Sequence, residues 1–173
     1  MKVTKSLLFF AATLIMLHAI SSCERDDICA ENTPTTPLLI IRFIDNNDGI
    51  TFKSPTDLRV KSTDSDITEN FLDAITQDSI AIPLKTTESI TEFEFTINAN
   101  SEDPDIIANT DTVSFQYTIS EEYVSTACGF RVIYNTLTRT LTNEDGEGNW
   151  IKDIRIQQLE VNNENAAHVY IFH

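Results

Sequence analysis

Apolar and polar residues alternate along most of this chain, and the alternation constrains the fold more than any other feature. Phe93, Phe95 and Ile97 lie on one face of an expected strand over 91–97, with polar residues between them. The segment 113–119 repeats the pattern. Successive side chains of a strand point to opposite sides, so a period of two indicates strands that bury one face.

Eight segments have the alternation or the composition of strands, and polar turn sequences separate them. They are 38–44, 58–61, 79–84, 91–97, 113–119, 129–141, 150–161 and 167–172. A bend is expected near Asn135, and 68–76 is predicted to form at most one short helix. Seven to eight short strands with such turns predict an all-β fold: an antiparallel β-sandwich, immunoglobulin-like or related, preceded by a signal peptide.

The N-terminus has the features of a secretory signal. Lys2 and Lys5 precede an apolar run of 14 residues over 7–20. A helix of that length reaches roughly 21 Å, short of the ~30 Å hydrocarbon core of a membrane. Two serines and Cys23 follow, and this segment resembles a relaxed bacterial lipobox. We therefore expect residues 1–22 to be a cleaved lipoprotein signal peptide. The alternative is an ordinary signal peptide followed by a structural cysteine.

An acylated Cys23 would begin a tether over 23–36, and the β-sandwich domain would occupy 37–173. The acidic residues of 24–27 resemble the export signal beside the lipidated cysteine of Bacteroidota surface lipoproteins. The alternative is a solvated acidic tether. The expected location is the outer membrane, lipid-anchored and facing the cell surface, with the periplasmic face as the alternative.

The charge balance excludes some partners. Removing Lys2 and Lys5 with the signal peptide leaves ten basic against 27 acidic side chains, a net charge of −17. Nucleic acids bind clusters of Lys and Arg, so no nucleic-acid partner is expected. Electrostatic attachment to anionic lipid is disfavoured for the same reason. The membrane contact is expected to come from acyl chains, each buried CH₂ contributing about 0.8 kcal/mol.

The chain has three cysteines. If Cys23 carries lipid, an exported protein has Cys29 and Cys128 left for one disulfide. The alternative of Cys128 as a nucleophile needs a nearby base, normally His. Metal ligation by these two cysteines with the remaining histidines lacks the ligand spacing of structural zinc sites. We expect no metal site and no cofactor.

Other segments offer weaker candidates. Ser79 and Thr112 follow aspartates in triplets that resemble an O-glycosylation sequon of exported Bacteroidota proteins, but an acidic turn residue leading into a strand is the favoured interpretation. The segment 143–148 has alternating oxygen ligands but lacks the closing Glu of a calcium loop, so a plain hairpin loop is favoured. Trp150, with Tyr134 and Tyr170, could form a sugar-stacking platform. Aromatic residues on strands are more often core or cross-strand pairs.

Several stretches together resemble a family. They are CERDDIC, TPTTP followed by LIIRF, YVSTACGF, NW and the terminal HVYIF. From Cys23 onward the chain resembles a family of small uncharacterised lipoproteins of the Bacteroidota, one of the domains of unknown function. The resemblance implies a location and a shared fold and carries no activity.

The sequence contains no recognisable catalytic constellation, so we expect a non-enzymatic binding or assembly module with an envelope protein or glycan as partner. The alternative is a secreted hydrolase of glycans or peptides that uses paired carboxylates. That alternative predicts a concave pocket with two close acids, at least one of them with a raised pKa. A spacer role in the envelope is not separable from the first hypothesis by sequence.

Overall fold

The structure, a computed structural model, describes residues 28–64, 66, 69–143 and 148–173. The signal peptide expected over 1–22 and the acylation expected at Cys23 lie outside these residues. The chain divides into two compact units. Of the described residues, the smaller unit contains 28–33 and 124–129, and the larger contains those of 34–123 and 130–173.

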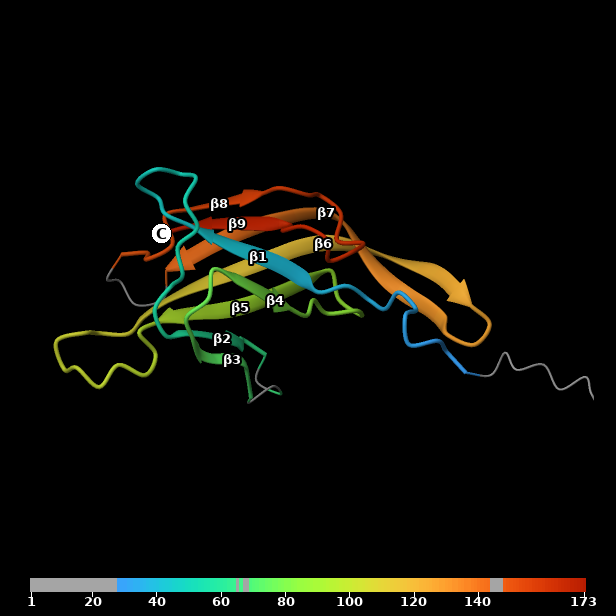
Figure 1. The fold of residues 1–173 in the computed structure, drawn as a ribbon, viewed down its shortest axis with the longest axis horizontal. Helices are drawn as coiled ribbons and strands as arrows, with labels where there is room; N and C mark the ends of the chain where they lie inside the picture. Colours follow the sequence, from blue (N-terminus) through green and yellow to red (C-terminus); the bar gives the residue numbers. More distant parts are fainter. Residues whose placement is uncertain (1–27, 65, 67–68, 144–147) are drawn as a thin grey trace, which may run out of the picture. The chain divides into compact units, whose positions relative to one another are not determined.

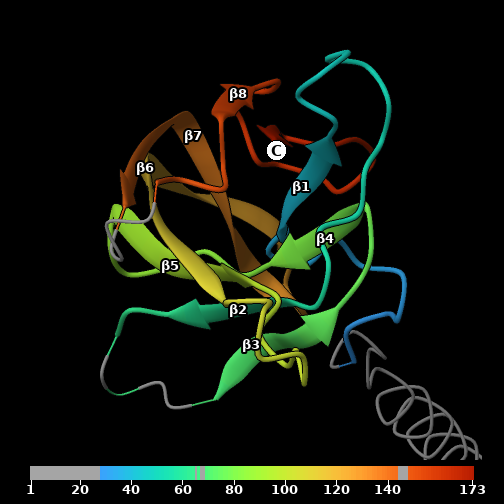
Figure 2. The ribbon, with the colours of Figure 1, turned by 90° about the vertical axis from the view of Figure 1, so that its left-hand side faces the viewer.

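The described residues form nine strands and no helix, which confirms the all-β prediction. The strands are β1 (Leu39–Ile44), β2 (Leu58–Ser62), β3 (Asn70–Ile75), β4 (Ser79–Ile82), β5 (Ile90–Ile97), β6 (Asn109–Ser125), β7 (Gly129–Asn143), β8 (Asp153–Ile156) and β9 (Val169–Phe172). They make a four-stranded sheet in the order β4-β1-β9-β8 and a five-stranded sheet in the order β3-β2-β5-β6-β7. Figures 1 and 2 show the two sheets as the layers of a sandwich.

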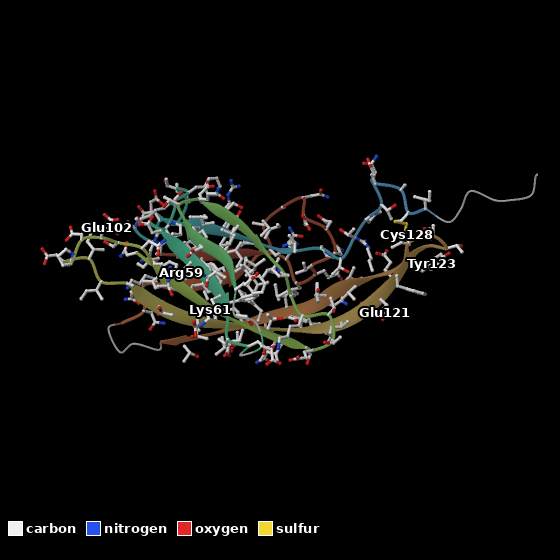
Figure 3. The ribbon with its side chains drawn as sticks, turned by 90° about the horizontal axis from the view of Figure 1, so that it is seen from below. Arg59, Lys61, Glu102, Glu121, Tyr123 and Cys128 are labelled. Carbon is white, nitrogen blue, oxygen red and sulfur yellow. A yellow bond between two sulfur atoms is a disulfide. The ribbon has the colours of Figure 1, made fainter. Side chains whose placement is uncertain are left out.

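The alternating residues of both sheets build the core of the larger unit. Leu39, Ile41 and Phe43 of β1 have no exposed surface, and neither have Phe93 and Phe95 of β5. On β2, Arg59 and Lys61 alternate with the buried residues and project from the outer side (Figure 3). One face of β1, of β2 and of β5 is therefore buried, as the period of two predicts.

One strand pair differs from the antiparallel prediction. β1 and β9 lie side by side in parallel, with Ile41 opposite Val169 and Phe43 opposite Ile171. Five other strand pairs are antiparallel: β1–β4, β2–β3, β2–β5, β5–β6 and β8–β9. Parallel neighbours need a long connection, and here most of the chain lies between them.

The expected short helix over 68–76 is wrong in the part that the structure describes, because 70–75 is strand β3. β3 pairs with β2 through two register shifts, with Leu72 opposite Val60 and Ile75 opposite Leu58. Ala74 has a positive φ of 51°. Such bulges break the period of two. The irregularity gave the apolar residues Phe71, Leu72 and Ile75 a spacing that resembles one turn of helix.

The expected strand over 150–161 is also longer than the observed one, since β8 covers only Asp153–Ile156. Beyond it Leu159 is 64% exposed, while Val161 is buried and bridges to Tyr134 of β7. β7 bends as expected, since Thr136, the residue after Asn135, has a φ of 55°. Eight of the nine strands were predicted, and β3 was missed.

Candidate functional site

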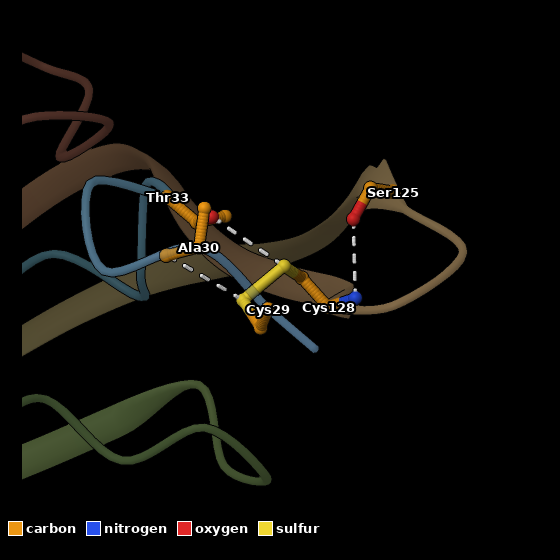
Figure 4. The surroundings of a disulfide bond; sticks show 5 residues. All are labelled: Cys29, Ala30, Thr33, Ser125 and Cys128. Carbon is orange, nitrogen blue, oxygen red and sulfur yellow. Dashed lines mark hydrogen bonds between the residues drawn. A yellow bond between two sulfur atoms is a disulfide. The ribbon is translucent and has the colours of Figure 1, made fainter. Parts of the chain in front are cut away.

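The cysteine pairing expected from the sequence is present in the smaller unit. A disulfide joins Cys29 to Cys128 across 99 positions of sequence, with the two Cα atoms 4.9 Å apart (Figure 4). The backbone N–H of Cys128 donates to the Ser125 hydroxyl at 3.1 Å. A sulfur held in a disulfide is no thiolate, so the nucleophile alternative for Cys128 is wrong for this form of the protein.

The smaller unit has a hollow of about 390 Å³ beside the disulfide. Its described walls carry short aliphatic and hydroxyl side chains: Ile28, Ala30, Thr33, Ser125, Thr126, Ala127 and Cys128. None of these side chains titrates near neutral pH. The walls of this hollow that the structure describes therefore offer no general acid or base for hydrolysis.

The larger unit has a cleft of about 370 Å³ that extends from Ser62 and Phe71 to the segment 83–88. Its cation is Lys85, whose Nζ lies 3.1 Å from an Asp64 oxygen and 3.0 Å from a Glu88 oxygen. The two carboxylates raise the pKa of Lys85. The ammonium is already neutralised within the protein, which leaves it little attraction for an anionic ligand.

A second hollow of about 210 Å³ shares Lys85 and is lined by Asp64, Glu88 and Glu92. The backbone N–H of Asp66, followed by the Lys85 ammonium, holds the pKa of Asp64 below its ordinary value. Glu92 pairs with the Ser114 hydroxyl. A general acid needs a raised pKa at neutral pH, and Asp64 has the opposite shift. Three acidic side chains line this hollow, but the lowered pKa of Asp64 does not suit a general acid in glycoside or peptide hydrolysis.

Two tyrosines form hydrogen bonds to the backbone of Leu84 and Lys85, which line the larger cleft. The Tyr117 hydroxyl donates to the Lys85 carbonyl at 2.9 Å and lies 2.5 Å from the Thr91 hydroxyl. The Tyr134 hydroxyl donates to the Leu84 carbonyl at 3.0 Å, and burial raises the pKa of Tyr134 to about 12. Both hydroxyls form hydrogen bonds to the backbone that follows β4 and so stabilise its conformation.

The sugar-stacking platform is not formed. Trp150 is 6% exposed and donates its indole N–H to the Phe95 carbonyl at 2.9 Å. Tyr134 is 1% exposed, and its ring meets that of Tyr117 edge-on at 4.9 Å. These rings belong to the core, where the polar end of each has found a backbone carbonyl.

The two candidate O-glycosylation residues lie on strands. Ser79 begins β4, is partly buried and donates its hydroxyl to the Ile41 carbonyl at 3.4 Å. Thr112 lies on β6 opposite Glu94 and is only 4% exposed. Glycosylation of either residue stays a prediction. A glycosyltransferase could reach Thr112 only before β6 pairs, because the folded sheet covers its hydroxyl.

Among the described residues no three His, Cys, Asp or Glu side chains converge as a metal site would require. Most of the loop 143–148 lies outside those residues. In the turn 45–51, the Asp45 carboxylate accepts the Asn47 N–H, and the Asp48 carboxylate accepts those of Ile50 and Thr51. The Asn47 N–H holds the pKa of Asp45 below its ordinary value, and the Thr51 hydroxyl, followed by the two N–H groups, does the same for Asp48. Their oxygens stabilise the turn itself.

An exposed aromatic pair lies on neighbouring strands of the five-stranded sheet. Tyr123 of β6 is 57% exposed and Phe130 of β7 is 64% exposed. Their ring centroids are 5.4 Å apart in an edge-to-face arrangement. Tyr123 lies two positions beyond Glu121 on the same strand (Figure 3). Sequence reasoning missed this pair, because strand aromatics were expected to face the core.

These features define a class: a disulfide-linked β-sandwich protein built from a four-stranded and a five-stranded sheet. No helix of the described part is long and apolar enough to cross a membrane. Residues 57–173, more than half of the chain, match DUF6452, a family of unknown function, and the chain belongs to that family. No curated protein and no solved structure matches the chain.

Proposed function

We propose that this protein is a lipoprotein held at the outer membrane by acyl chains on Cys23, where its β-sandwich serves as a non-enzymatic binding or assembly module. The proposal joins the DUF6452 domain to the small Bacteroidota lipoproteins that the sequence resembles.

The disulfide is the observation that carries the proposal. It pairs Cys29 with Cys128, the two cysteines that the structure describes, so neither of them is available as a disulfide partner for Cys23. Disulfides persist in oxidising compartments, which supports export of the chain. Cys23 follows a charged start and a short apolar run, where a lipoprotein signal would place the acylated residue.

The charged residues that follow Cys23 support export of the protein to the outer membrane. The acidic segment 24–27 directly follows Cys23, as in exported surface lipoproteins. With a net charge of −17, the mature chain gains nothing from an anionic lipid surface. Two or more acyl chains hold a protein stably without such help.

The non-enzymatic part of the proposal is supported by the hollows. The hollow beside the disulfide has no titratable wall, and the cleft around Lys85 has its cation paired with Asp64 and Glu88. A binding or assembly role needs no tuned acid or nucleophile, and it fits a rigid two-sheet scaffold.

The test uses the full chain in its own host. The expected result is an N-terminal peptide beginning at Cys23 with the mass of its acyl groups, and loss of the domain from intact cells treated with protease. In Cys23→Ala the acylated peptide disappears and the domain leaves the membrane fraction, while the Cys29–Cys128 disulfide persists. An unacylated Cys23 in the wild type would refute the anchor. Protection from protease would place the domain on the periplasmic face.

The non-enzymatic role has its own test. The purified protein is expected to release no product from pools of glycans and peptides. Product release that disappears in an Asp64→Asn/Glu88→Gln variant would replace the binding role by hydrolysis at the Lys85 cleft. Lys85→Met is the matched control, because it removes the cation of the ion pairs and keeps both acids. Product release that depends on the two acids should persist in this variant.

A further inference from the structure

Tyr123 of β6 and Phe130 of β7 are both exposed large hydrophobic side chains of the larger unit. More than half of each side chain is exposed, and the rings contact one another edge-on. Contiguous exposed apolar surface, unlike singly scattered apolar side chains, marks sites that contact another protein or a membrane. Tyrosine in particular is favoured where an apolar environment meets water.

Covalent bonds limit how far this pair can be from the proposed lipid anchor. Cys29 is six positions after Cys23, and whatever the conformation between them, six Cα-to-Cα steps span at most about 21 Å. The disulfide adds 4.9 Å between Cα atoms to Cys128. Phe130 follows Cys128 by two residues, or at most about 7 Å. Without the disulfide, more than one hundred residues would separate the anchor from Phe130, and no such limit would exist.

The charges beside the pair permit contact with a neutral surface. Glu122 directly precedes Tyr123 in sequence, and Arg131 directly follows Phe130. These two side chains form an ion pair, with Arg131 Nε and Glu122 Oε2 2.6 Å apart. Glu121 lies two positions before Tyr123, on the same side of the strand, and is exposed. A carboxylate there remains at the level of the lipid headgroups. Together with the acidic net charge, it favours zwitterionic over anionic lipid.

We infer that Tyr123 and Phe130 rest in the headgroup region of the membrane that holds the acylated Cys23, so that the domain is docked on the lipid surface through β6 and β7. This inference rests on the proposed function. Two aromatic rings alone bind a membrane weakly. The anchor makes their insertion an intramolecular event, so a weak contact is enough to orient the domain.

The experiment uses the acylated full chain reconstituted in zwitterionic phosphatidylcholine vesicles that contain brominated acyl chains, which quench tryptophan on contact. Wild-type emission comes from Trp150 alone, which is 6% exposed and is expected to stay unquenched. Tyr123→Trp and Phe130→Trp place reporters on the pair. Side chains at the interface lie about 5–10 Å deep, so each variant should lose up to roughly half of its emission, Trp150 supplying the rest.

Ile107→Trp is the matched control. Ile107 is 66% exposed, like Phe130, and precedes the start of β6. Tyr123 lies 16 residues further on, which is about 50 Å of extended strand. The emission of the Ile107→Trp variant should therefore be the same in brominated and ordinary vesicles. These positions are exposed, so the substitutions should change stability by about 0.5 kcal/mol or less.

The outcomes separate the two proposals. Protein that floats with the vesicles and is quenched at 123 and 130, but not at 107, supports the docking. Protein that floats without this difference overturns the docking and keeps the anchor. This result would leave a protein partner or a second copy of the chain as the occupant of the pair. Protein that lacks acyl groups and does not float overturns both.

Discussion

His168 bonds twice to Ile40, at the end of the parallel pairing between β1 and β9. Its backbone N–H donates to the Ile40 carbonyl at 2.9 Å, and its ring Nδ1 accepts the Ile40 N–H at 3.0 Å. The imidazole thus occupies the place of a backbone acceptor just before β9 begins. Since Nδ1 accepts, the neutral ring carries its proton on Nε2. Burial lowers the pKa of this completely covered side chain.

The first prediction concerns stability and pH. The folded-state pKa of His168 is below the ordinary 6.5, so the unfolded chain binds the proton more readily than the folded one. The free energy of unfolding should therefore fall as the pH drops below about 6.5. Urea denaturation at pH 7.5 and pH 5 measures the change. A protein with equal stability at both values would contradict the assignment.

The control variants separate His168 from His173, whose pKa burial also lowers. His168→Asn keeps a side-chain oxygen that can accept the Ile40 N–H, and it should reduce the pH dependence. His168→Ala leaves that N–H without its acceptor and should cost about 1–3 kcal/mol at pH 7.5 as well. The lowered pKa values of Asp45, Asp48 and Asp64 act in a separate, more acidic range.

The sequence predicted the strands with regular alternation. β5 and β6 were found from the alternation of Phe93 and Phe95, and of Val113 and Phe115, because each buries one face against the opposite sheet. β3 was missed because its bulges disturb that period. The parallel neighbour of β1 was missed because pairing between distant strands depends on the topology, and no local pattern encodes it.

For the candidate site, the disulfide followed from counting cysteines, whereas the ion pairs of Lys85 did not follow from anything in the sequence. Asp64 and Glu88 stand 21 and three residues from Lys85, and β2–β5 bring them together. Acidic residues are so frequent here that no pair stands out before folding. The exposure of Tyr123 and Phe130 was equally hidden, since strand aromatics usually pack inward.

The second prediction concerns the disulfide. Cys29→Ser/Cys128→Ser should lower the free energy of unfolding by up to about 4.7 kcal/mol, the chain-entropy estimate for a loop of about 100 residues. Denaturation with and without reductant measures it. Reductant should destabilise the wild type and leave the double variant unchanged. A wild type that is indifferent to reductant would show that the loop closure contributes nothing.

The third prediction concerns the aromatic core. Phe93 is fully buried, and its ring lies within 6.4 Å of those of Phe71, Phe95 and Phe115. Phe93→Ala should therefore cost about 3–5 kcal/mol, because the surrounding rings cannot collapse into the space. The exposed Ile107→Ala should change stability by about 0.5 kcal/mol or less. Equal effects in thermal denaturation would argue against the packing described.

The fourth prediction uses Trp150, the only tryptophan of the chain. Its burial predicts blue-shifted native emission that moves to longer wavelength in urea. Trp150→Phe deprives the Phe95 carbonyl of its indole donor and should cost about 1–3 kcal/mol. Tyr170→Phe, on the half-buried side of β9, is the control and should lie within about 0.5 kcal/mol of the wild type. Native emission like that of free tryptophan would contradict the burial.

The neighbouring positions of β1 and β9 also decide when the domain can be completed. β1 is the first strand of the part of the chain that the structure describes and β9 the last, yet both are interior strands of the four-stranded sheet. A chain that emerges N-terminus first from a ribosome or an export channel offers β1 only one partner, β4, until residues 169–172 arrive. Until then one edge of β1 has unpaired backbone groups and can pair with other chains. The arrival of β9 covers this edge, so the last strand of the described chain protects the first from aggregation.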